Sequence, residues 1–512
     1  MPDAYGRIDD QEKPRHKKFA HSTVNGFGYG DGPHKMKPVT QKFEEKAKET
    51  LLDSQIQKNL SGLYEGFHSA RIQASSDTAD WEELQSKGRE IKEEVINNLD
   101  KYLELLESKI LSSGGAVHFA ETAEDATQYV INLAKKRDVK TVVKSKSMLS
   151  EEMSLNEELT KNGIDPYETD LGEYIVQLAE ETPYHIIAPA IHKSRSEVSK
   201  LFSEKIGTSE TENIETLTSE ARDQLRDKFI QADMGITGGN FLVAETGTLA
   251  LVSNEGNGRM CTSMPRIHVA IVGMEKIIPS MEDLGTFLRL LIRSATGQWI
   301  SSYVTMISGP RKSTDVDGPE EFHLVIVDNG RSKMLANPQL REALYCLRCG
   351  ACLNACPVYR KVGGHSYGWV YPGPIGSIVS PMLTGLSDGK NLPFASSLCG
   401  ACKEACPVKI DIPRMLLYLR NQLVEGNDYP DQRTSKLWER YLSKCGAFIL
   451  ANSKLTNTLM KSASLIANIA PFVRKPFPAS WKKTRESPAL AKKTFVEQWA
   501  SLELDSSFRK KH

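Results

Sequence analysis

Four of the chain's nine cysteines fall within one short segment, CLRCGACLNACP, which spans residues 346–357. They follow the spacing C-x2-C-x2-C-x3-C-P, and a shorter run, C-x2-C-x3-C-P, follows at residues 399–407. Structural zinc is usually held by two separate C-x-x-C knuckles that close a tetrahedron of four ligands. Three cysteines at successive spacings of three instead suit one face of an iron–sulfur cubane, in which each thiolate binds one iron. The pattern therefore favours iron–sulfur chemistry over a zinc module or idle thiols.

The proline that follows each run indicates how the ligands are shared. In two-cluster ferredoxins the fourth cysteine of a run, the one before proline, binds the other cluster. The chain would then bind two clusters, which we expect to be [4Fe-4S]. On this rule the metal ligands are, for cluster one, Cys346, Cys349, Cys352 and Cys406, and, for cluster two, Cys356, Cys399 and Cys402.

Cluster two lacks a fourth cysteine, because position 396, the counterpart of Cys346, holds serine. Three arrangements stay open: a three-iron cluster, a four-iron cluster with a non-cysteine or external ligand, and recruitment of Cys261 or Cys445. A serine hydroxyl is a poor substitute for a thiolate because it holds its proton tightly. Both spare cysteines stand in apolar contexts, which favours a structural role. His365 lies in the long insertion between the runs, and we expect a loop histidine with ordinary partners rather than a ligand.

The rest of the sequence limits the protein's class and compartment. The chain opens with a polar stretch of mixed charge, without the apolar run of a signal peptide, and no run of eighteen apolar residues follows. We therefore expect a cytoplasmic protein, in which thiols stay reduced and clustered cysteines hold metal rather than disulfides. The 65 basic and 65 acidic residues cancel, so no overall field favours nucleic acid or membrane. Walker, dinucleotide-binding and H-E-x-x-H motifs are absent from the sequence.

Before the cysteines, apolar strand-like runs alternate with helical patterns, which is typical of a mostly parallel sheet covered on both faces. The runs AVHFA, TVVKS, HIIAPA, RIHVAIVG and FHLVIVDN are predicted strands, and Thr246-Gly247 is the predicted turn of an antiparallel pair. Asp80 and Glu83 fit a capping box that opens a long helix. The expected organisation is a polar tail at 1–45, a helical lead-in with an α/β domain at 46–330, a two-cluster ferredoxin-type domain at 335–430, and a basic helical region at 431–512.

The α/β domain also offers a candidate ligand site. Glu245 and Arg259 flank glycine-rich turns whose backbone N–H groups could bind an anion, and Arg259 suits a carboxylate or phosphate. Lys144 ends a predicted strand, at the edge where parallel α/β sheets bind ligands. Ordinary turn chemistry and solvated charge explain the same residues, and the catalytic residues stay unknown.

Several segments resemble the lactate utilisation protein B family, the iron–sulfur subunit of the bacterial L-lactate utilisation complex. They are VVKSKSM (142–148), ETDLGEYIVQL (168–178), HIIAPAIHK (185–193), GNFLVAETGTLALVSNEGNGRM (239–260), the two cysteine runs and the YPGPIG loop. The resemblance implies an α/β domain similar to the sugar-phosphate isomerase and CoA-transferase fold, followed by an α-helical two-[4Fe-4S] segment and C-terminal helices. The family shows the same seven-cysteine pattern, whereas the long tail at 1–45 departs from it.

The resemblance also implies a function: an electron-transfer subunit, without catalysis of its own, in a complex that oxidises L-lactate to pyruvate. The implied partners are a cysteine-rich subunit of the heterodisulfide-reductase type and a small subunit that carries only the α/β domain. Two alternatives stay open. One is the iron–sulfur subunit of a related 2-hydroxy-acid oxidase that acts on glycolate. The other is an α/β-domain enzyme for a small carboxylate or CoA ligand, with the clusters as a regulatory tail.

Overall fold

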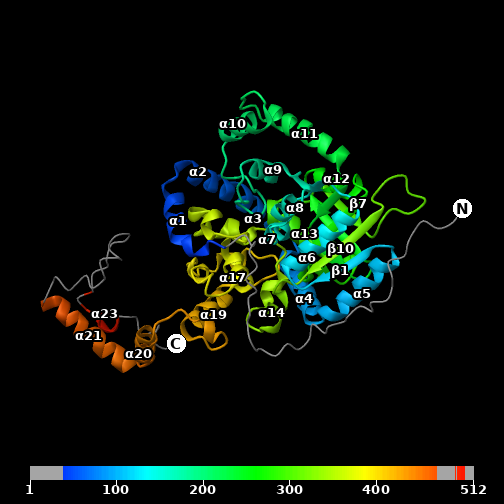
Figure 1. Ribbon diagram of the computed structural model, residues 1–512. Coiled ribbons are helices and arrows are strands. Elements are labelled where there is room, and N and C mark those ends of the chain that lie inside the picture. Colours follow the sequence, from blue (N-terminus) through cyan, green and yellow to red (C-terminus); the bar gives the residue numbers. More distant parts are fainter. Residues whose placement is uncertain (1–37, 470–490, 492, 502–512) are drawn as a thin grey trace. The chain divides into compact units, whose positions relative to one another are not determined.

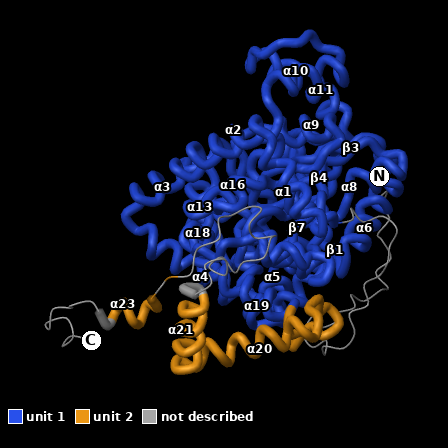
Figure 2. Tube along the Cα trace, turned by 90° about the vertical axis from the view of Figure 1, so that its left-hand side faces the viewer, with its two compact units in different colours: residues 1–423 blue, residues 424–512 orange. Residues whose placement is uncertain are grey.

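The computed structural model describes residues 38–469, 491 and 493–501. The chain divides into two compact units, residues 1–423 and 424–512 (Figure 2). Most of the expected polar tail, residues 1–37, lies outside the described part. From Thr40 onward the chain is already helical, so the described lead-in begins a few residues earlier than expected.

A six-stranded sheet in which every pair of neighbours is parallel forms the core of the first unit, in the order β1-β10-β7-β4-β2-β3 (Figure 1). Its strands are β1 (Ala116–Ala120), β2 (Thr141–Lys144), β3 (Asp165–Glu168), β4 (Met234–Thr237), β7 (Ile267–Gly273) and β10 (Glu321–Val327). Alternate residues of a strand point to opposite faces, and β10 buries both: Val325 joins one apolar cluster, while Leu324 and Ile326 join another. Burial on both faces explains the unbroken apolar run.

Helices and a second sheet cover the two faces. On one face lie α6 (Ala123–Lys136), α7 (Met148–Glu152) and α8 (Leu155–Lys161). On the other face lie α4 (Trp81–Asn97), α5 (Leu99–Ser112) and a four-stranded sheet, β8-β5-β6-β9. Its strands are β5 (Phe241–Val243), β6 (Thr248–Ser253), β8 (Ile277–Ile278) and β9 (Tyr303–Ile307). The predicted antiparallel pair is confirmed as β5 and β6, and Gly247 turns between them at φ 68°.

A third apolar cluster lies near the β2 and β3 edge of the large sheet. It gathers residues of α9 (Leu171–Leu178), α10 (Arg195–Ile206), α11 (Ile214–Gln231) and α12 (Asn257–Ser263). The α/β fold class with a mostly parallel sheet is thus confirmed. The sequence analysis missed the short strands β3, β4, β8 and β9.

Two local predictions are wrong. HIIAPA forms a turn instead of a strand, because the His185 Nδ1 accepts the backbone N–H groups of Ile187 and Ala188, at 3.1 and 3.3 Å. The N–H of Tyr184 closes the turn by donating to the carbonyl of Pro189 at 2.9 Å. An apolar run alone does not separate a strand from a buried turn.

The other wrong prediction is the capping box before α4. Asp80 makes no side-chain capping bond, because its carboxylate accepts a hydrogen bond from Nη2 of Arg289 at 2.6 Å. A tertiary ion pair has replaced the local cap.

The cysteine segment is a set of short helices around the two runs. They are η4 (Arg341–Tyr345), α15 (Ala351–Ala355), α16 (Tyr359–Val362), η5 (His365–Tyr367), α17 (Gly373–Thr384), η6 (Leu392–Phe394) and α18 (Ala401–Glu404), and α14 (Arg331–Ala336) precedes them. α19 (Ile412–Glu425) follows and crosses from the first unit into the second.

The lead-in helices pack on the cysteine segment as well as preceding the sheet in sequence. They are α1 (Phe43–Leu52), α2 (Ser54–Leu63), η2 (Tyr64–His68) and α3 (Ser69–Ser76), and Figure 1 shows α1 and α2 beside the yellow cysteine segment. The Gln57 amide donates to the carbonyl of Lys361 at 2.7 Å. The guanidinium of Arg360 lies over the ring of Tyr64. The lead-in therefore shields the cysteine segment.

The second unit is helical, with α20 (Leu437–Ala451), α21 (Ser453–Ile469) and α23 (Phe495–Ser501). Large apolar side chains of α20 are exposed, Leu437 by 77% and Tyr441 by 71%. None of the helices in the described part of the chain has the length and apolar character needed to cross a membrane.

Candidate metal centre

The two cysteine runs repeat one backbone conformation. In each run a residue with positive φ stands on either side of a cysteine, and a short helix that contains the next cysteine follows. The four residues are Arg348 (60°) and Gly350 (76°) in the first run, and Leu398 (57°) and Gly400 (88°) in the second. Positive φ is uncommon outside glycine. Its recurrence before both Cys349 and Cys399 therefore shows that these cysteines hold equivalent places in the two runs.

Four cysteines line one pocket at the first run. They are Cys346, Cys349, Cys352 and, from the end of the second run, Cys406. The other lining includes apolar side chains from several elements: Ile186, Ile375, Val408, Ile410 and Ile412. The four cysteines that the crossing rule groups as cluster one thus face one apolar pocket. Thiols from separate segments, gathered in an apolar site, fit the donor set of a four-iron cluster.

The other three cysteines of the runs also form a group. Burial, followed by the thiolate charges of Cys356 and Cys399, raises the pKa of the Cys402 thiol to about 12. Cys356 and Cys402 are buried, whereas Cys399 is exposed. Cys352 lies on α15 and Cys402 on α18, and these two helices pack against each other. The two groups of cysteines are therefore neighbours.

Arg348 lines the first pocket, and two buried lysines, Lys92 and Lys276, interact electrostatically with Cys346. Arg348 lies over the ring of Tyr371, 4.3 Å from its centroid. Its Nη1 is buried and has no hydrogen-bond partner among the described residues. Burial lowers the pKa of Lys92 to about 7 and of Lys276 to about 8, and the Cys346 thiolate charge acts on both lysines in the opposite direction. A buried, unpaired guanidinium nitrogen beside four thiols fits an anionic group such as a cluster with thiolate ligands.

A buried ion network supports these cations. Arg331 donates from Nη1 and Nη2 to the two carboxylate oxygens of Glu152, at 3.0 and 2.9 Å, and from Nε to Glu275 at 2.8 Å. The Tyr371 hydroxyl donates to Glu152 at 2.6 Å and ties the cysteine segment to α7. Burial favours a neutral Glu275, but the charges of Arg331, Lys276 and Arg348 hold its pKa down to about 2.

Sequence reasoning missed these cations. Lys92 stands in the charged run GREIKEE, where a solvated side chain is the ordinary expectation, yet it is 2% exposed and donates to the backbone carbonyl of Glu275 at 2.5 Å. The sequence carries no signal for it beyond the apolar Ile91 beside it. Sequence reasoning also missed that the turn at His185 is part of the site. The Nε2 of His185 lies within hydrogen-bond distance of Oδ1 of Asn354 on α15, at 3.0 Å.

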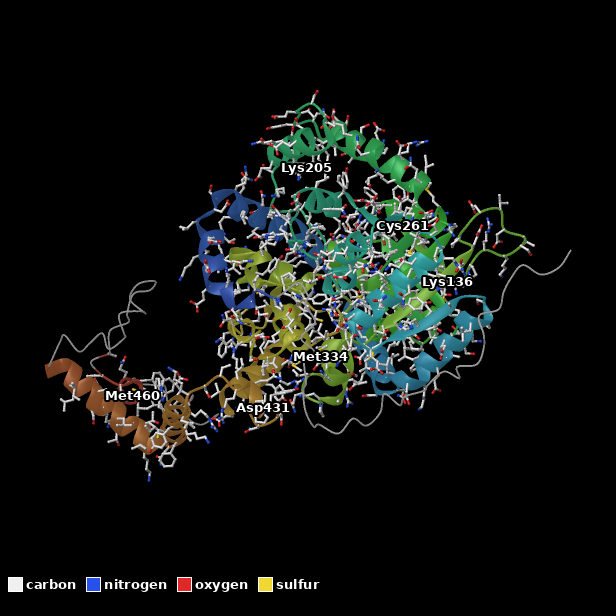
Figure 3. The ribbon with its side chains drawn as sticks, in the orientation of Figure 1. Lys136, Lys205, Cys261, Met334, Asp431 and Met460 are labelled. Atoms are coloured by element: carbon white, nitrogen blue, oxygen red, sulfur yellow. The ribbon has the colours of Figure 1, made fainter. Side chains whose placement is uncertain are left out.

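The spare cysteine of the α/β domain has other partners. Cys261 is fully buried on α12, in the sheet domain (Figure 3), and its Sγ lies 3.4 Å from the hydroxyl of Thr169. Burial raises its pKa to about 12. Cys445 lies on α20, in the second unit. His365 is placed as expected for a loop histidine: its Nε2 is 2.7 Å from the carbonyl of Thr182, and burial lowers its pKa to about 4.

The three residues of the candidate ligand site do not contact one another in the structure. Lys144 is buried, and its Nζ donates to Glu168 and Asn156, each at 2.6 Å. Glu245 is exposed and accepts the backbone N–H of Met281 at 3.1 Å, and Arg259 is exposed on α12. No hydrogen bond or ion pair within the described ranges links any two of the three. A shared ligand site at Lys144, Glu245 and Arg259 stays a prediction.

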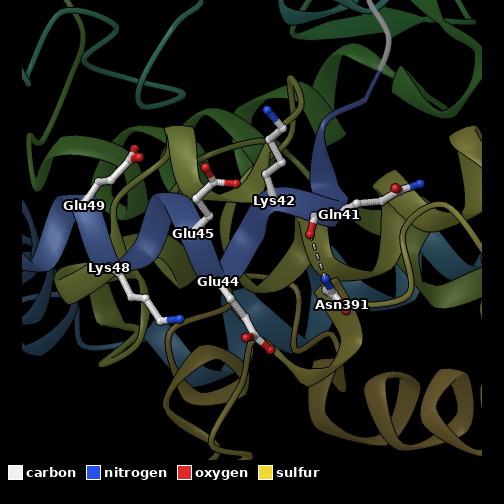
Figure 4. A pocket seen from close by; sticks show the side chains of 7 residues that line it. All are labelled: Gln41, Lys42, Glu44, Glu45, Lys48, Glu49 and Asn391. Carbon is white, nitrogen blue, oxygen red and sulfur yellow. Dashed lines mark hydrogen bonds between the residues drawn. The ribbon is translucent and has the colours of Figure 1, made fainter.

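A second hollow lies on α1, away from the cysteines, and polar side chains line it (Figure 4). They are Gln41, Lys42, Glu44, Glu45, Lys48, Glu49 and Asn391. Its charges are mixed, and its one internal bond joins Asn391 to the carbonyl of Gln41 at 3.2 Å. In the described part of the chain, no group of three or more His, Cys, Asp or Glu side chains is placed to hold a single metal ion. The cysteine pocket is the stronger candidate, because it gathers four thiols in an apolar lining.

Two family models match the chain: the LUD domain over residues 103–327 and the 4Fe-4S dicluster domain over residues 342–410. Lactate utilization protein B of Bacillus licheniformis is 45% identical over 468 residues, which cover 90% of this chain and 96% of that protein. Lactate utilization protein B of Bacillus subtilis is 43% identical over 476 residues, which cover 91% of this chain and 98% of that protein. The chain belongs to the lactate utilization protein B family, as the resemblance predicted.

A crystal structure of a DUF162 family protein from Deinococcus radiodurans also matches. It is 14% identical, covers 45% of this chain and 98% of its own, and superposes with a TM-score of 0.25. That likeness is too weak to carry an argument. The family and the 4Fe-4S match support a role in lactate utilisation with iron–sulfur clusters, while the ligand assignment of the seven cysteines stays a prediction.

Proposed function

We propose that this chain carries single electrons through two iron–sulfur clusters, within a complex that oxidises L-lactate to pyruvate. The observation that carries the proposal is the adjacency of the two cysteine groups, because α15, which holds Cys352, packs against α18, which holds Cys402. A four-iron cluster supplies one-electron transfer at a potential between about −700 and +450 mV, which depends on net charge, hydrogen bonds to sulfur and exposure.

The residues around the pocket have separate tasks. Cys346, Cys349, Cys352 and Cys406 would hold the first cluster, and Cys356, Cys399 and Cys402 the second. Ile186, Ile410 and Ile412 exclude water from the first site. The guanidinium of Arg348 compensates negative charge there, and the ion network of Arg331 holds the wall of the α/β domain in place.

The electron balance requires partners. Oxidation of lactate to pyruvate releases two electrons and two protons, whereas a cluster of this kind accepts one electron at a time. The chain would receive the electrons singly from a substrate site on a companion subunit and pass them to a carrier. We propose the cysteine-rich subunit and the small α/β subunit as companions, and the cytoplasm as the location.

Anaerobic purification tests the cofactor. The protein should be brown and hold about seven to eight irons per chain, since two clusters of up to four irons each are expected. A colourless protein with one or two zinc ions would end the proposal. Turnover of lactate or an acyl-CoA by the isolated chain, surviving Cys→Ser changes in both runs, would instead favour the α/β enzyme.

Growth of a deletion strain tests the substrate. The strain should fail on lactate and grow normally on glycolate, and the wild-type chain should restore growth whereas Cys352→Ser should not. Failure on glycolate with normal growth on lactate would favour the 2-hydroxy-acid oxidase alternative.

Truncation tests the partner role of the C-terminal helices. Removal of residues 431–512 deletes α20, with its exposed Leu437 and Tyr441, but none of the seven cysteines of the runs. The truncated chain should keep its iron and lose co-purification with its companions. If it still retains the whole complex, the docking role of these helices is wrong.

A further inference from the structure

Ser396 places a side-chain oxygen at the position where the crossing rule leaves cluster two without a fourth thiolate. The two runs share one backbone conformation, so position 396 in the second run corresponds to position 346 in the first. In the first run the backbone N–H of Arg348 donates to Sγ of Cys346 at 3.4 Å. In the second run the backbone N–H of Leu398 donates to Oγ of Ser396 at 3.1 Å. The side-chain oxygen of Ser396 thus takes the local hydrogen bond that the ligand sulfur takes in the first run.

The backbone at Ser396 is held from outside the run. Arg420, on α19, donates from Nη2 to the carbonyl of Ser396 at 2.9 Å and from Nε to the carbonyl of Pro393 at 2.8 Å. The guanidinium therefore fixes residues 393–396 and places a positive charge beside Ser396. Both effects favour an anionic oxygen there, since a nearby cation and a donated N–H each stabilise the charged form.

Other candidates for the fourth ligand in the first unit already have partners. Cys261 is buried in an apolar cluster of the α/β domain, where it contacts Thr169, and His365 contacts the carbonyl of Thr182. Ser396 is half-buried and lies three positions before Cys399, which is the spacing that Cys346 has from Cys349.

We propose that Oγ of Ser396 is the fourth protein ligand of cluster two and binds, as an alkoxide, the iron that lacks a thiolate. The inference rests on the proposed function, because it requires that cluster. On binding, the Ser396 O–H bond breaks, its proton leaves to solvent, and an oxygen–iron bond forms; no electron is transferred. The metal charge makes the deprotonation possible, as it does for other coordinating groups.

Three variants test the proposal. Ser396→Ala removes the oxygen, Ser396→Cys supplies the thiolate of the first run, and Ser397→Ala is the matched control at the exposed neighbour. Anaerobically purified proteins are oxidised with a measured excess of ferricyanide, and the three-iron signal is followed by electron paramagnetic resonance. Ser396→Ala should form that signal at least about tenfold faster than wild type, because even indirect supports of a metal site change affinity by about 10- to 100-fold. Ser396→Cys should form it more slowly, and Ser397→Ala at the wild-type rate.

A second measurement separates a serine ligand from bound water. In water enriched in oxygen-17, electron–nuclear double resonance of the reduced wild-type protein should show no coupling to exchangeable oxygen at cluster two. Ser396→Ala should gain that coupling as water takes the open place. Ser396→Cys should lack it, and this variant keeps the test valid if the alanine variant loses cluster two altogether.

Failure of the serine ligand can be distinguished from failure of the proposed function. Oxygen-17 coupling in wild type, with equal conversion rates for wild type and Ser396→Ala, would overturn the serine ligand and leave the proposed function intact. A wild-type chain without cluster iron would overturn both.

Discussion

The two cysteine groups differ in what surrounds them. The first faces an apolar pocket and buried cations, Arg348, Lys92 and Lys276, that a network of carboxylates only partly balances. The second includes the exposed Cys399 and lies beside buried tyrosines, whose pKa values rise through burial and then through neighbouring groups that include the thiolates. Positive charge stabilises the reduced state of a cluster, which is the more negative one. The first group should therefore hold the cluster of higher potential, and the second the cluster that exchanges electrons at the surface.

The largest effect should come from the cysteines that cross between the runs. Cys406→Ser should remove cluster one, because Cys406 lines the first pocket although it belongs to the second run. Cys356→Ser should remove cluster two. Each variant should lose the iron of one cluster, about three to four of the expected seven to eight irons, and the spectrum of that cluster only. If Cys356→Ser removes the cluster of higher potential instead, each run binds its own cluster and the comparison is reversed.

The ion network behind the first group should give the next largest effect. Arg331→Met leaves the buried Glu152 and Glu275 without their main partner, and breaking a buried pair in this way costs about 3–5 kcal/mol. Thermal unfolding of the anaerobic protein should shift down strongly, with loss of cluster one before cluster two. Arg311→Met breaks an exposed pair with Glu320 and is the control, with an expected cost of about 0–1 kcal/mol. Equal unfolding temperatures of Arg331→Met and Arg311→Met would show that the ion network does not support the first site.

The sequence predicts those features of the two sites that depend on local spacing or on apolar runs, and it misses those that depend on contacts between distant residues. The cysteine spacing is local and rigid, so it identifies the seven cysteines and the place of Ser396. The strands β7 and β10 follow from apolar runs that require burial on both faces. The burial of Lys92 cannot be predicted in this way, because it depends on the carbonyls of Glu275 and Ile277, which are distant in sequence. The prediction of a strand at His185 is wrong for a similar reason, because hydrogen bonds to the histidine side chain, and not an apolar pattern, determine the backbone conformation there.

Arg348 tests the difference in potential directly. Arg348→Met removes a buried positive charge beside Cys346 while keeping the bulk and the positive φ of the position. The potential of cluster one should fall by on the order of 100 mV, because a nearby unit charge contributes about 2 kcal/mol at an effective dielectric constant of about 20, and 2.3 kcal/mol corresponds to about 100 mV per electron. Redox titration followed by electron paramagnetic resonance measures it.

Arg348→Lys is the matched control, since it keeps the charge and should hold most of the wild-type potential. An unchanged potential in Arg348→Met, or an equal fall for both clusters, would remove the electrostatic basis of the comparison.

The smallest effect should be a pH dependence confined to cluster one. Burial lowers the pKa of Lys92 to about 7 and that of Lys276 to about 8, from ordinary values near 10.4. Below pH 7 both ammonium groups are charged, and as the pH rises through about 7 to 8 they lose their protons and stop stabilising the reduced cluster. Glu275, with a pKa of about 2, stays charged throughout and contributes no slope. The potential of cluster one should therefore fall by tens of millivolts between pH 6.5 and 9, at no more than about 59 mV per pH unit for a single proton coupled to one electron.

The potential of cluster two should depend less on pH, and Lys92→Met should reduce the slope of cluster one. A slope of equal size at both clusters, or one that Lys92→Met leaves unchanged, would show that these lysines do not set the difference between the two sites.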